Sequence, residues 1–206
     1  QDLLSGQIDI GLVPVAILPQ LSNPHIVSKY VIGANGAVAS VALFSEVPID
    51  QIKNIYLDYQ SRTSVQLLKI LLAQYWKVEV NFLLATEGYI AQISDTTAGV
   101  IIGDRALENL SKYPYVYDLG LAWKQLTGLP FVFAAWVANQ PIPSAFMAAF
   151  DAANGHGLAH LDEVIGFIPA QEQLYDLNKY YTENINYVYD EEMKKGLAAF
   201  LNFIKS

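Results

Sequence analysis

The sequence predicts a mixed α/β fold. Short apolar runs alternate along the chain with segments whose apolar residues recur at helical spacing. Hydrophobic residues make up 53% of the 206 residues and charged residues only 16%, which excludes a disordered chain and allows a large core. The alternation is typical of parallel α/β sheets, which bind ligands beyond the carboxyl ends of their strands. We therefore look for function first at the junctions where a strand leads into a helix.

Five apolar runs are expected to be buried strands, because each is short and lies between turn-forming or polar residues. They cover residues 8–15, 38–44, 55–59, 97–102 and 131–137. Helical spacing of apolar residues predicts a helix over 64–76, and a shorter helix is expected to begin at Arg105. The last third is predicted to be helical, over residues 144–153, 158–167, 174–181 and 184–189, with a final helix over 191–204 capped by Asp190.

The charge of the chain argues against nucleic acid as a partner. The formal net charge is −8, and the only arginines are Arg62 and Arg105, so the basic face of a nucleic-acid-binding protein is missing. The longest apolar stretch, residues 129–138, is about half as long as a membrane span of roughly 18 residues or more, so we expect no membrane partner. The absence of cysteine removes disulfides, thiolate nucleophiles and cysteine-ligated metals.

The strongest local signal is the run Asp-Tyr-Gln-Ser-Arg-Thr-Ser at residues 58–64, where a predicted strand turns into a predicted helix. A helix N-terminus offers free N–H groups and a partial positive charge. The side chains of Ser61, Arg62, Thr63 and Ser64 would add donors for a carboxylate or phosphate. The alternative is simple N-capping by Ser61 or Thr63 with Arg62 in solvent, but one cap residue would suffice for that.

A second candidate site lies at Gly103-Asp104, where another predicted strand ends. Glycine allows a ligand to approach the backbone closely, and Asp104 could orient a substrate hydroxyl or accept a proton. We favour the simpler interpretation that Asp104 caps the following helix.

Two further candidate stretches are less specific. Thr127 and Gly128 would place a hydroxyl and backbone donors just before the predicted strand at 131–137, although an ordinary loop would look the same. Val13 and Pro14 lie at the end of the first predicted strand, where proline removes a donor from the sheet.

A metal site is not expected. His156 and His160 have the four-residue spacing of two ligands on one helix face, with Glu163 nearby, but glycines flank His156 and a third clear ligand is missing. His25 stands alone in a proline-flanked segment and is interpreted as structural. The glycine-rich signatures of dinucleotide and P-loop sites, and the nucleophile elbow of serine hydrolases, do not occur.

Several stretches, in order over nearly the whole chain, resemble the MqnA family, the chorismate dehydratases of the futalosine route to menaquinone. The similar stretches are residues 6–15, 40–45, 59–64, 102–107, 117–120, 127–136, 181–185 and 196–197, together with Trp123. The resemblance implies conversion of chorismate to 3-[(1-carboxyvinyl)oxy]benzoate by a cytoplasmic enzyme without a cofactor. It leaves the oligomeric state open, a dimer being one option.

The resemblance also implies a two-lobed fold of the type II periplasmic-binding-protein class, with a ligand cleft between the lobes. We expect the hinge near Ser45-Glu46 and near residues 129–131. Lobe one would then comprise residues 1–45 and 130–206, and lobe two residues 46–129. The family carries an N-terminal strand at the cleft that this sequence lacks. Since the chain starts like the end of a helix closing on Gly6, we expect residues to precede Gln1.

On this hypothesis Ser61, Thr63 and Ser64 bind one carboxylate of chorismate, and Thr127 with Gly128, or the end of strand 8–15, contacts the opposite end. Asp104 would contact the ring hydroxyl, and no convincing general base is present. Two alternatives stay open: a solute-binding protein for a small carboxylate, and the 1,4-dihydroxy-6-naphthoate synthase of the same pathway. The synthase uses a histidine base, and no histidine stands at a comparable strand end here.

Overall fold

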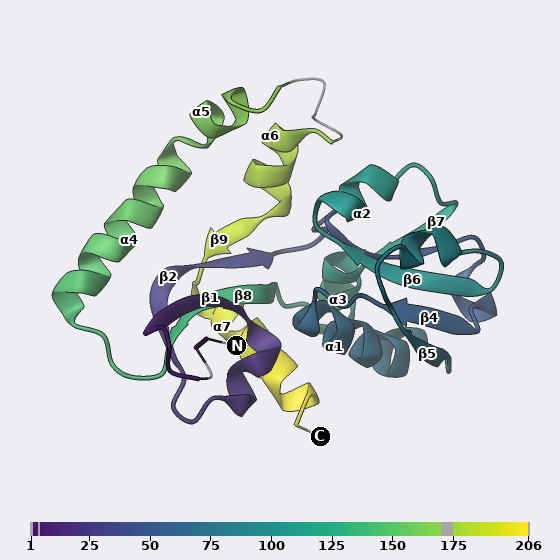
Figure 1. The fold of residues 1–206 in the computed structure, drawn as a ribbon, viewed down its shortest axis with the longest axis horizontal. Helices are drawn as coiled ribbons and strands as arrows, with labels where there is room; N and C mark the ends of the chain where they lie inside the picture. The colour runs from purple at the N-terminus through teal and green to yellow at the C-terminus, as the bar shows by residue number, and fades with distance from the viewer. Residues whose placement is uncertain (1, 4, 170–174, 206) are drawn as a thin grey trace.

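The computed structural model describes residues 2–3, 5–169 and 175–205, and it shows two α/β lobes side by side (Figure 1). The two-lobed, periplasmic-binding-protein-like α/β class is confirmed. The first lobe contains a four-stranded sheet in the order β1-β8-β2-β9. Its strands are β1 (Ile10–Pro14), β8 (Phe131–Ala138), β2 (His25–Ala34) and β9 (Asn186–Val188). The 3-10 helix η1 (Val15–Gln20) follows β1 directly.

The second lobe contains a five-stranded sheet in the order β5-β4-β6-β3-β7. Its strands are β3 (Val41–Ser45), β4 (Asn54–Leu57), β5 (Asn81–Leu84), β6 (Thr97–Ile102) and β7 (Tyr115–Asp118). Helices α1 (Arg62–Leu71) and α3 (Leu119–Thr127) pack on one face of this sheet. Helix α2 (Asp104–Asn109) and the 3-10 helix η4 (Tyr89–Gln92) cover the other face.

The remaining helices belong mainly to the C-terminal third. Helix α4 (Ser144–Ala159) is followed by α5 (Leu161–Gly166), α6 (Leu177–Lys179), the π-helical turn η6 (Tyr180–Asn184) and α7 (Glu191–Phe203). The predicted cap holds, since Asp190 accepts a hydrogen bond from the Met193 N–H at the start of α7. Helix α4 lies along the outside of the first lobe with none of its residues fully buried (Figure 1). The 3-10 turn η2 (Ile49–Gln51) precedes β4, and the π-helical turn η3 (Leu72–Trp76) directly follows α1.

Strand pairing corrects the expectation of parallel sheets. Strand β4 is parallel to β5 and β6, but the other strand pairs of the described residues are antiparallel. The predicted helix over 184–189 is also wrong, because Asn186–Val188 forms strand β9. Strands β2, β5 and β7 were not predicted, since their apolar runs are interrupted by polar or exposed residues. Part of the helix predicted over 174–181 lies outside the described residues.

The chain crosses between the two sheets twice, between Ala34 and Val41 and between Thr127 and Phe131. The second crossing lies where the hinge was expected. The first lies earlier than the expected Ser45-Glu46 hinge, because strand β3 pairs with β6 and β7 and so belongs to the five-stranded sheet. We therefore propose that lobe two begins near Val41 rather than at residue 46.

Aromatic packing fills the junction of the two lobes. Trp123 of α3 is fully buried and packs edge-on against Phe131 and Phe200, which come from β8 and α7. Its indole N–H also donates to the Pro130 carbonyl on the second crossing segment. In the described parts of the chain, no helix combines the length and apolarity that crossing a bilayer requires.

Candidate functional site between the lobes

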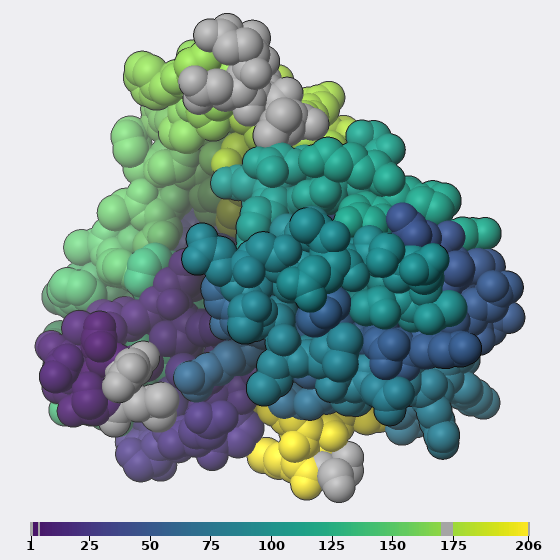
Figure 2. Space-filling model, turned by 45° about the vertical axis from the view of Figure 1, so that its right-hand side comes forward, coloured from purple at the N-terminus to yellow at the C-terminus, as the bar shows by residue number. Residues whose placement is uncertain are grey.

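The candidate site lies at the carboxyl edge of the five-stranded sheet. Because β4 and β6 are parallel neighbours, their carboxyl ends meet at this edge. The run 58–64 follows β4, and Gly103-Asp104 follows β6, so the fold brings two of the four candidate stretches together. The molecular surface is hollowed where the two lobes meet (Figure 2).

The hydroxyl groups at the start of α1 form a connected group. Ser61 is the N-cap, and its Oγ accepts a hydrogen bond from the Ser64 N–H at 3.1 Å. The same Oγ donates to the Ser64 Oγ at 2.8 Å. Thr63 and Ser64 are both 2% exposed. Simple capping therefore explains Ser61, but it does not explain why two further hydroxyls are buried beside it.

Thr63 joins the two lobes. Its Oγ1 accepts a hydrogen bond of 3.2 Å from the Ala16 N–H, at the start of η1 and just beyond the end of β1. The candidate residues Val13 and Pro14 are half-buried and lead directly to this contact. The end of the first strand is thus brought to the start of α1, while the Thr63 hydroxyl keeps its own proton to donate.

A cavity of about 450 Å³ adjoins this contact. Ala16 and Gln20 line it from the first lobe, and Ser61, Arg62 and Lys69 line it from the second. Arg62 is exposed and is placed in this lining rather than packed against the hydroxyl group. Asp58 also lines the cavity, but its carboxylate is paired with Arg105. The cavity thus presents two cationic side chains next to the start of a ten-residue helix, an arrangement that favours an anion.

The Gly103-Asp104 turn differs from its expected role. Gly103 has φ +64° and is itself the N-cap residue of α2, without a side-chain capping bond. Asp104 is the first residue of α2 and is exposed, so the prediction that it caps this helix is wrong. The left-handed conformation of Gly103 turns the chain so that its N–H donates to the Ser40 carbonyl at 2.8 Å.

Tyr180, which sequence reasoning missed, reaches this turn from the first lobe. Its hydroxyl donates to the Ser40 Oγ at 2.8 Å. Burial raises the pKa of Tyr180, and the nearby carboxylate of Asp104 adds to the increase, while the bond to Ser40 lowers it. Tyr187 lies in the neighbouring strand β9, and burial is the main cause that raises its pKa to about 12. These tyrosines stay protonated donors at neutral pH.

Within the described residues, no hydrogen bond brings Thr127 or Gly128 into this group. They end helix α3: the Thr127 Oγ1 donates to the Trp123 carbonyl at 2.8 Å and accepts from the Leu129 N–H at 3.1 Å. Gly128 has φ +74° and its N–H donates to the Lys124 carbonyl. This is an ordinary helix C-terminus with a left-handed glycine.

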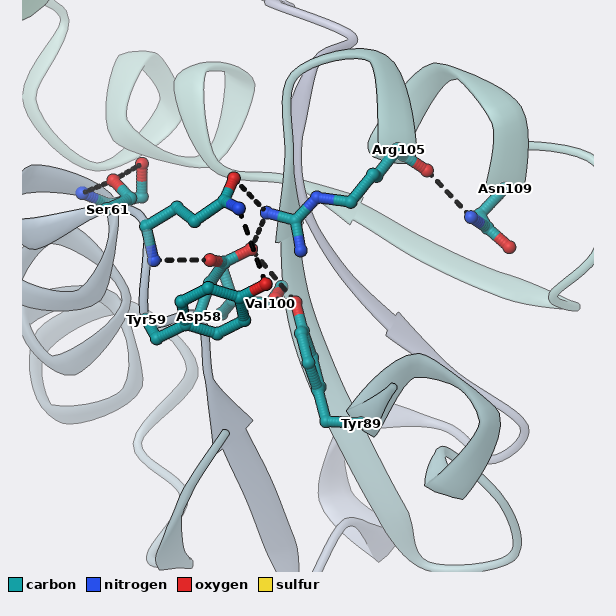
Figure 3. A network of polar contacts seen from close by, with 9 residues as sticks. Asp58, Tyr59, Ser61, Tyr89, Val100, Arg105 and Asn109 are labelled. Atoms are coloured by element: carbon teal, nitrogen blue, oxygen red, sulfur yellow. Dashed lines mark hydrogen bonds and ion pairs between the residues drawn. The ribbon is translucent and has the colours of Figure 1, made fainter. Parts of the chain in front are cut away.

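A buried polar network, also missed from the sequence, joins the two turns (Figure 3). Asp58 is 3% exposed and forms an ion pair of 2.8 Å with the Arg105 Nη2. Its carboxylate also accepts from the Tyr89 hydroxyl at 2.9 Å and from the Gln60 N–H at 2.7 Å. The Arg105 Nη2 donates in addition to the Gln60 Oε1 at 2.8 Å. The sequence did hold a signal for this network. Asp58 lies at the end of one predicted strand, and Arg105, one of only two arginines, lies just after the end of another.

The Tyr89 hydroxyl acts as a hydrogen-bond donor. Burial raises the pKa of Tyr89 well above its ordinary value, and the charge of Asp58 raises it further. The same hydroxyl lies within hydrogen-bond distance of the Val100 carbonyl on β6. Tyr89 is therefore a fixed donor that supports the buried carboxylate.

The histidines lie away from this edge. His25 begins β2, and His156 and His160 face each other on α4 and just beyond it, with ring centroids 4.1 Å apart. The His160 Nδ1 is 2.7 Å from the His156 carbonyl oxygen. Within residues 2–3, 5–169 and 175–205, no three histidine, aspartate or glutamate side chains gather as a metal site would require.

Comparison of the structure with known structures supports the fold. A protein of Archaeoglobus fulgidus superposes with a TM-score of 0.61 at 13% identity, covering 100% of this chain and 84% of its own. A Xanthomonas citri protein bound to ATP superposes with a TM-score of 0.53 at 9% identity, covering 99% of this chain and 80% of its own. At such identities these two likenesses concern the fold alone.

Sequence comparison supports the family. A chorismate dehydratase of Thermus thermophilus is 29% identical over 222 aligned residues, which cover 96% of this chain and 80% of that protein. A chorismate dehydratase of Campylobacter jejuni is 44% identical over 57 residues, or 27% of this chain and 26% of that protein. A family model described as menaquinone biosynthesis matches residues 1–206, which confirms the resemblance to the MqnA family. The chain therefore belongs to the menaquinone biosynthesis family.

Proposed function

We propose that the chain is a chorismate dehydratase, a hydro-lyase that converts chorismate to 3-[(1-carboxyvinyl)oxy]benzoate in menaquinone biosynthesis. Family membership and the similarity to the Thermus enzyme support this reaction. The observation that carries it is the group of hydroxyls at the start of α1, Ser61, Thr63 and Ser64, placed against Ala16 of the other lobe.

The reaction is redox-neutral. One ring hydrogen leaves as a proton and the ring hydroxyl leaves as hydroxide, so one water is lost and the ring becomes aromatic. Aromatisation supplies the driving force, and the protein must hold a dianion, assist departure of hydroxide and exclude bulk water.

The site residues are assigned to these tasks as part of the proposal. Ser61, Thr63 and Ser64, with the N-terminal end of α1, bind one carboxylate, and the exposed Arg62 attracts the dianion. Asp104, at the same sheet edge, contacts the ring hydroxyl. Thr127 and Gly128 are left out of this assignment because their polar groups are used in the end of α3.

Incubation of the protein with chorismate, without added metal or nucleotide, tests the reaction. We expect a product lighter by one water, with new aromatic proton signals in its NMR spectrum. Chorismate that is bound and recovered unchanged would contradict the proposal and favour a solute-binding protein. Failure to bind chorismate, together with turnover of the naphthoate synthase substrate, would favour the sister enzyme.

Thr63→Val tests the anion site, because valine has the shape of threonine without its hydroxyl. We expect kcat/KM for chorismate to fall about 10- to 100-fold, the range for losing a hydrogen bond to a charged group. The variant also leaves the buried Ala16 N–H unpaired, which lowers the free energy of unfolding by about 1–3 kcal/mol.

Thr63→Ser is the matched control, since it keeps the hydroxyl and should retain most of the activity. Thermal unfolding of both variants separates lost catalysis from lost folding. A folded Thr63→Val protein with a kcat/KM near that of the wild type would remove Thr63 from the site.

A further inference from the structure

Arg105 has no role in the function as proposed so far, yet its guanidinium is fixed by an ion pair and a further hydrogen bond. Nη2 of its guanidinium donates to two acceptors, the Asp58 carboxylate and the Gln60 side-chain carbonyl, both at 2.8 Å. Its side chain is 27% exposed. The guanidinium also lies 5.7 Å from the centre of the Tyr59 ring, which is half exposed.

Arg105 has donors that its contacts with Asp58 and Gln60 do not use, and its side chain is partly exposed. A guanidinium carries N–H groups on Nε, Nη1 and Nη2 in a rigid plane. Among the described residues, the hydrogen bonds that Arg105 donates from its side chain all come from Nη2. The bonds from Nη2 to Asp58 and Gln60 fix the guanidinium plane. This lowers the entropy cost of binding a further acceptor at Nε and Nη1.

The partner carboxylate does not fully cancel the charge of Arg105. Asp58 also accepts from the Tyr89 hydroxyl and the Gln60 N–H, so its negative charge is shared among three donor residues. Asp58 therefore holds the guanidinium in place while part of its own charge is satisfied by neutral groups.

The position of Arg105 matches a second anion. Gln60, which it contacts, immediately precedes Ser61, the cap of α1. Figure 3 shows Arg105 and Ser61 on opposite sides of Asp58 at the ends of β4 and β6. The Arg105 guanidinium and the hydroxyls at the start of α1 thus lie on the neighbouring turns that follow β6 and β4, with residues 58–60 between them.

We propose that Arg105 is a specificity-determining residue that binds the second carboxylate of a dicarboxylate substrate through Nε and Nη1, while the hydroxyls at the start of α1 bind the first. This inference rests on the proposed function, because chorismate carries two carboxylates. It explains why a buried aspartate positions an arginine that is itself partly exposed.

The test compares ligands that differ by one charge. The ligands are 3-[(1-carboxyvinyl)oxy]benzoate and its two monomethyl esters, one on each carboxylate. Dissociation constants are measured by calorimetry for the wild type and for Arg105→Gln. We expect Arg105→Gln to weaken binding of the dicarboxylate about 10- to 100-fold. It should not further weaken the one monoester that lacks the carboxylate held by Arg105.

Two further variants keep the result interpretable. Arg105→Gln combined with Asp58→Asn removes both charges, so that no buried carboxylate is left unpaired if the single variant folds poorly. It should show the same pattern of ligand affinities. Lys112→Gln is the charge-matched control, because Lys112 is exposed on the turn after α2, and it should bind all three ligands as the wild type does.

Equal loss of affinity for the dicarboxylate and both monoesters would overturn the inference, since a purely structural role weakens every ligand. Wild-type affinity in Arg105→Gln would overturn it as well. Failure of the proposed function is a separate result, namely wild-type protein that leaves chorismate unchanged. In that case the ester series still tests Arg105, because it measures binding and not turnover.

Discussion

Gly196, in the middle of α7, shows how closely the first lobe packs at the scale of one residue. A Cβ at this position would overlap the carbonyl oxygen of Pro130, which is backbone and cannot swing away. Gly157, in α4, is also helical, but a Cβ there would meet nothing within 4 Å. The two glycines have the same intrinsic cost in a helix and opposite surroundings.

Gly196→Ala should therefore lower the free energy of unfolding by about 1–3 kcal/mol, the usual cost of overpacking a core. Gly157→Ala should raise it by about 0.5–1 kcal/mol, because alanine is the better helix former. Urea titrations followed by circular dichroism measure both changes. An equally stable Gly196→Ala protein would mean that α7 can move away from the second crossing segment.

Asp118 controls how one element meets the next. It caps α3 through the Leu121 N–H and also accepts hydrogen bonds from the Val38 and Ala39 N–H groups, at 2.9 and 2.7 Å. Ala39 has φ +61°, a conformation that costs energy for a residue with a side chain, and the bond to Asp118 compensates for it. One carboxylate thus fixes the first crossing segment to the start of a helix.

The same residue predicts a pH dependence of stability. Burial raises the pKa of Asp118 above its ordinary value of 3.8, although four backbone hydrogen bonds oppose the shift. The folded state then holds this proton more tightly than the unfolded state. The contribution of Asp118 to stability should therefore be greatest at acidic pH and should fall as the pH rises from 3.8 through the raised pKa.

The measurement is the free energy of unfolding of the wild type minus that of Asp118→Asn, followed across this pH range. Residue 118 of the variant does not titrate, so the difference isolates the carboxyl group. A difference that increases with pH would show that the hydrogen bonds outweigh burial and that the pKa is lowered.

At the scale of the whole molecule, hydrogen bonds tie the first lobe to the second lobe and to the first crossing segment. The Ala16–Thr63 bond lies at the start of α1, and the Tyr180–Ser40 bond lies at the turn that holds Gly103. Tyr180 begins the π-helical turn η6, and Asn184 at its other end donates to the Ala37 carbonyl. The C-terminal segment is thus fixed to the first crossing segment at two points.

Tyr180→Phe should release one of these points. We expect faster amide hydrogen exchange in residues 35–40 and 177–184, with little change in the five-stranded sheet, because the substitution removes a hydroxyl without changing packing volume. Hydrogen exchange read by mass spectrometry measures it. Tyr75→Phe is the control, since its hydroxyl donates to the Gln125 side chain of α3 and, among the described residues, contacts neither segment. Unchanged exchange in both regions would show that Asn184 suffices to hold them.

Local patterns predicted much of the fold and part of the site. The apolar runs at 97–102 and 131–137 are strands in the structure, since a continuous buried run of that length has few other solutions. Strands β5 and β7 were missed because edge strands carry exposed and polar residues. Antiparallel pairing was missed because hydrogen bonding between distant segments leaves no local signature.

The sequence by itself determined the α/β class and the concentration of hydroxyls at Ser61, Thr63 and Ser64, since composition, periodicity and capping chemistry are local properties. The two lobes and the family followed from its resemblance to the MqnA family, which rests on stretches spread over the whole chain. Only the tertiary structure decided which groups surround those hydroxyls. It set Ala16 against Thr63, turned Tyr180 toward Ser40 and directed Arg105 onto Asp58. These contacts join residues 47, 140 and 47 positions apart, and their geometry follows from how two sheets pack and cross.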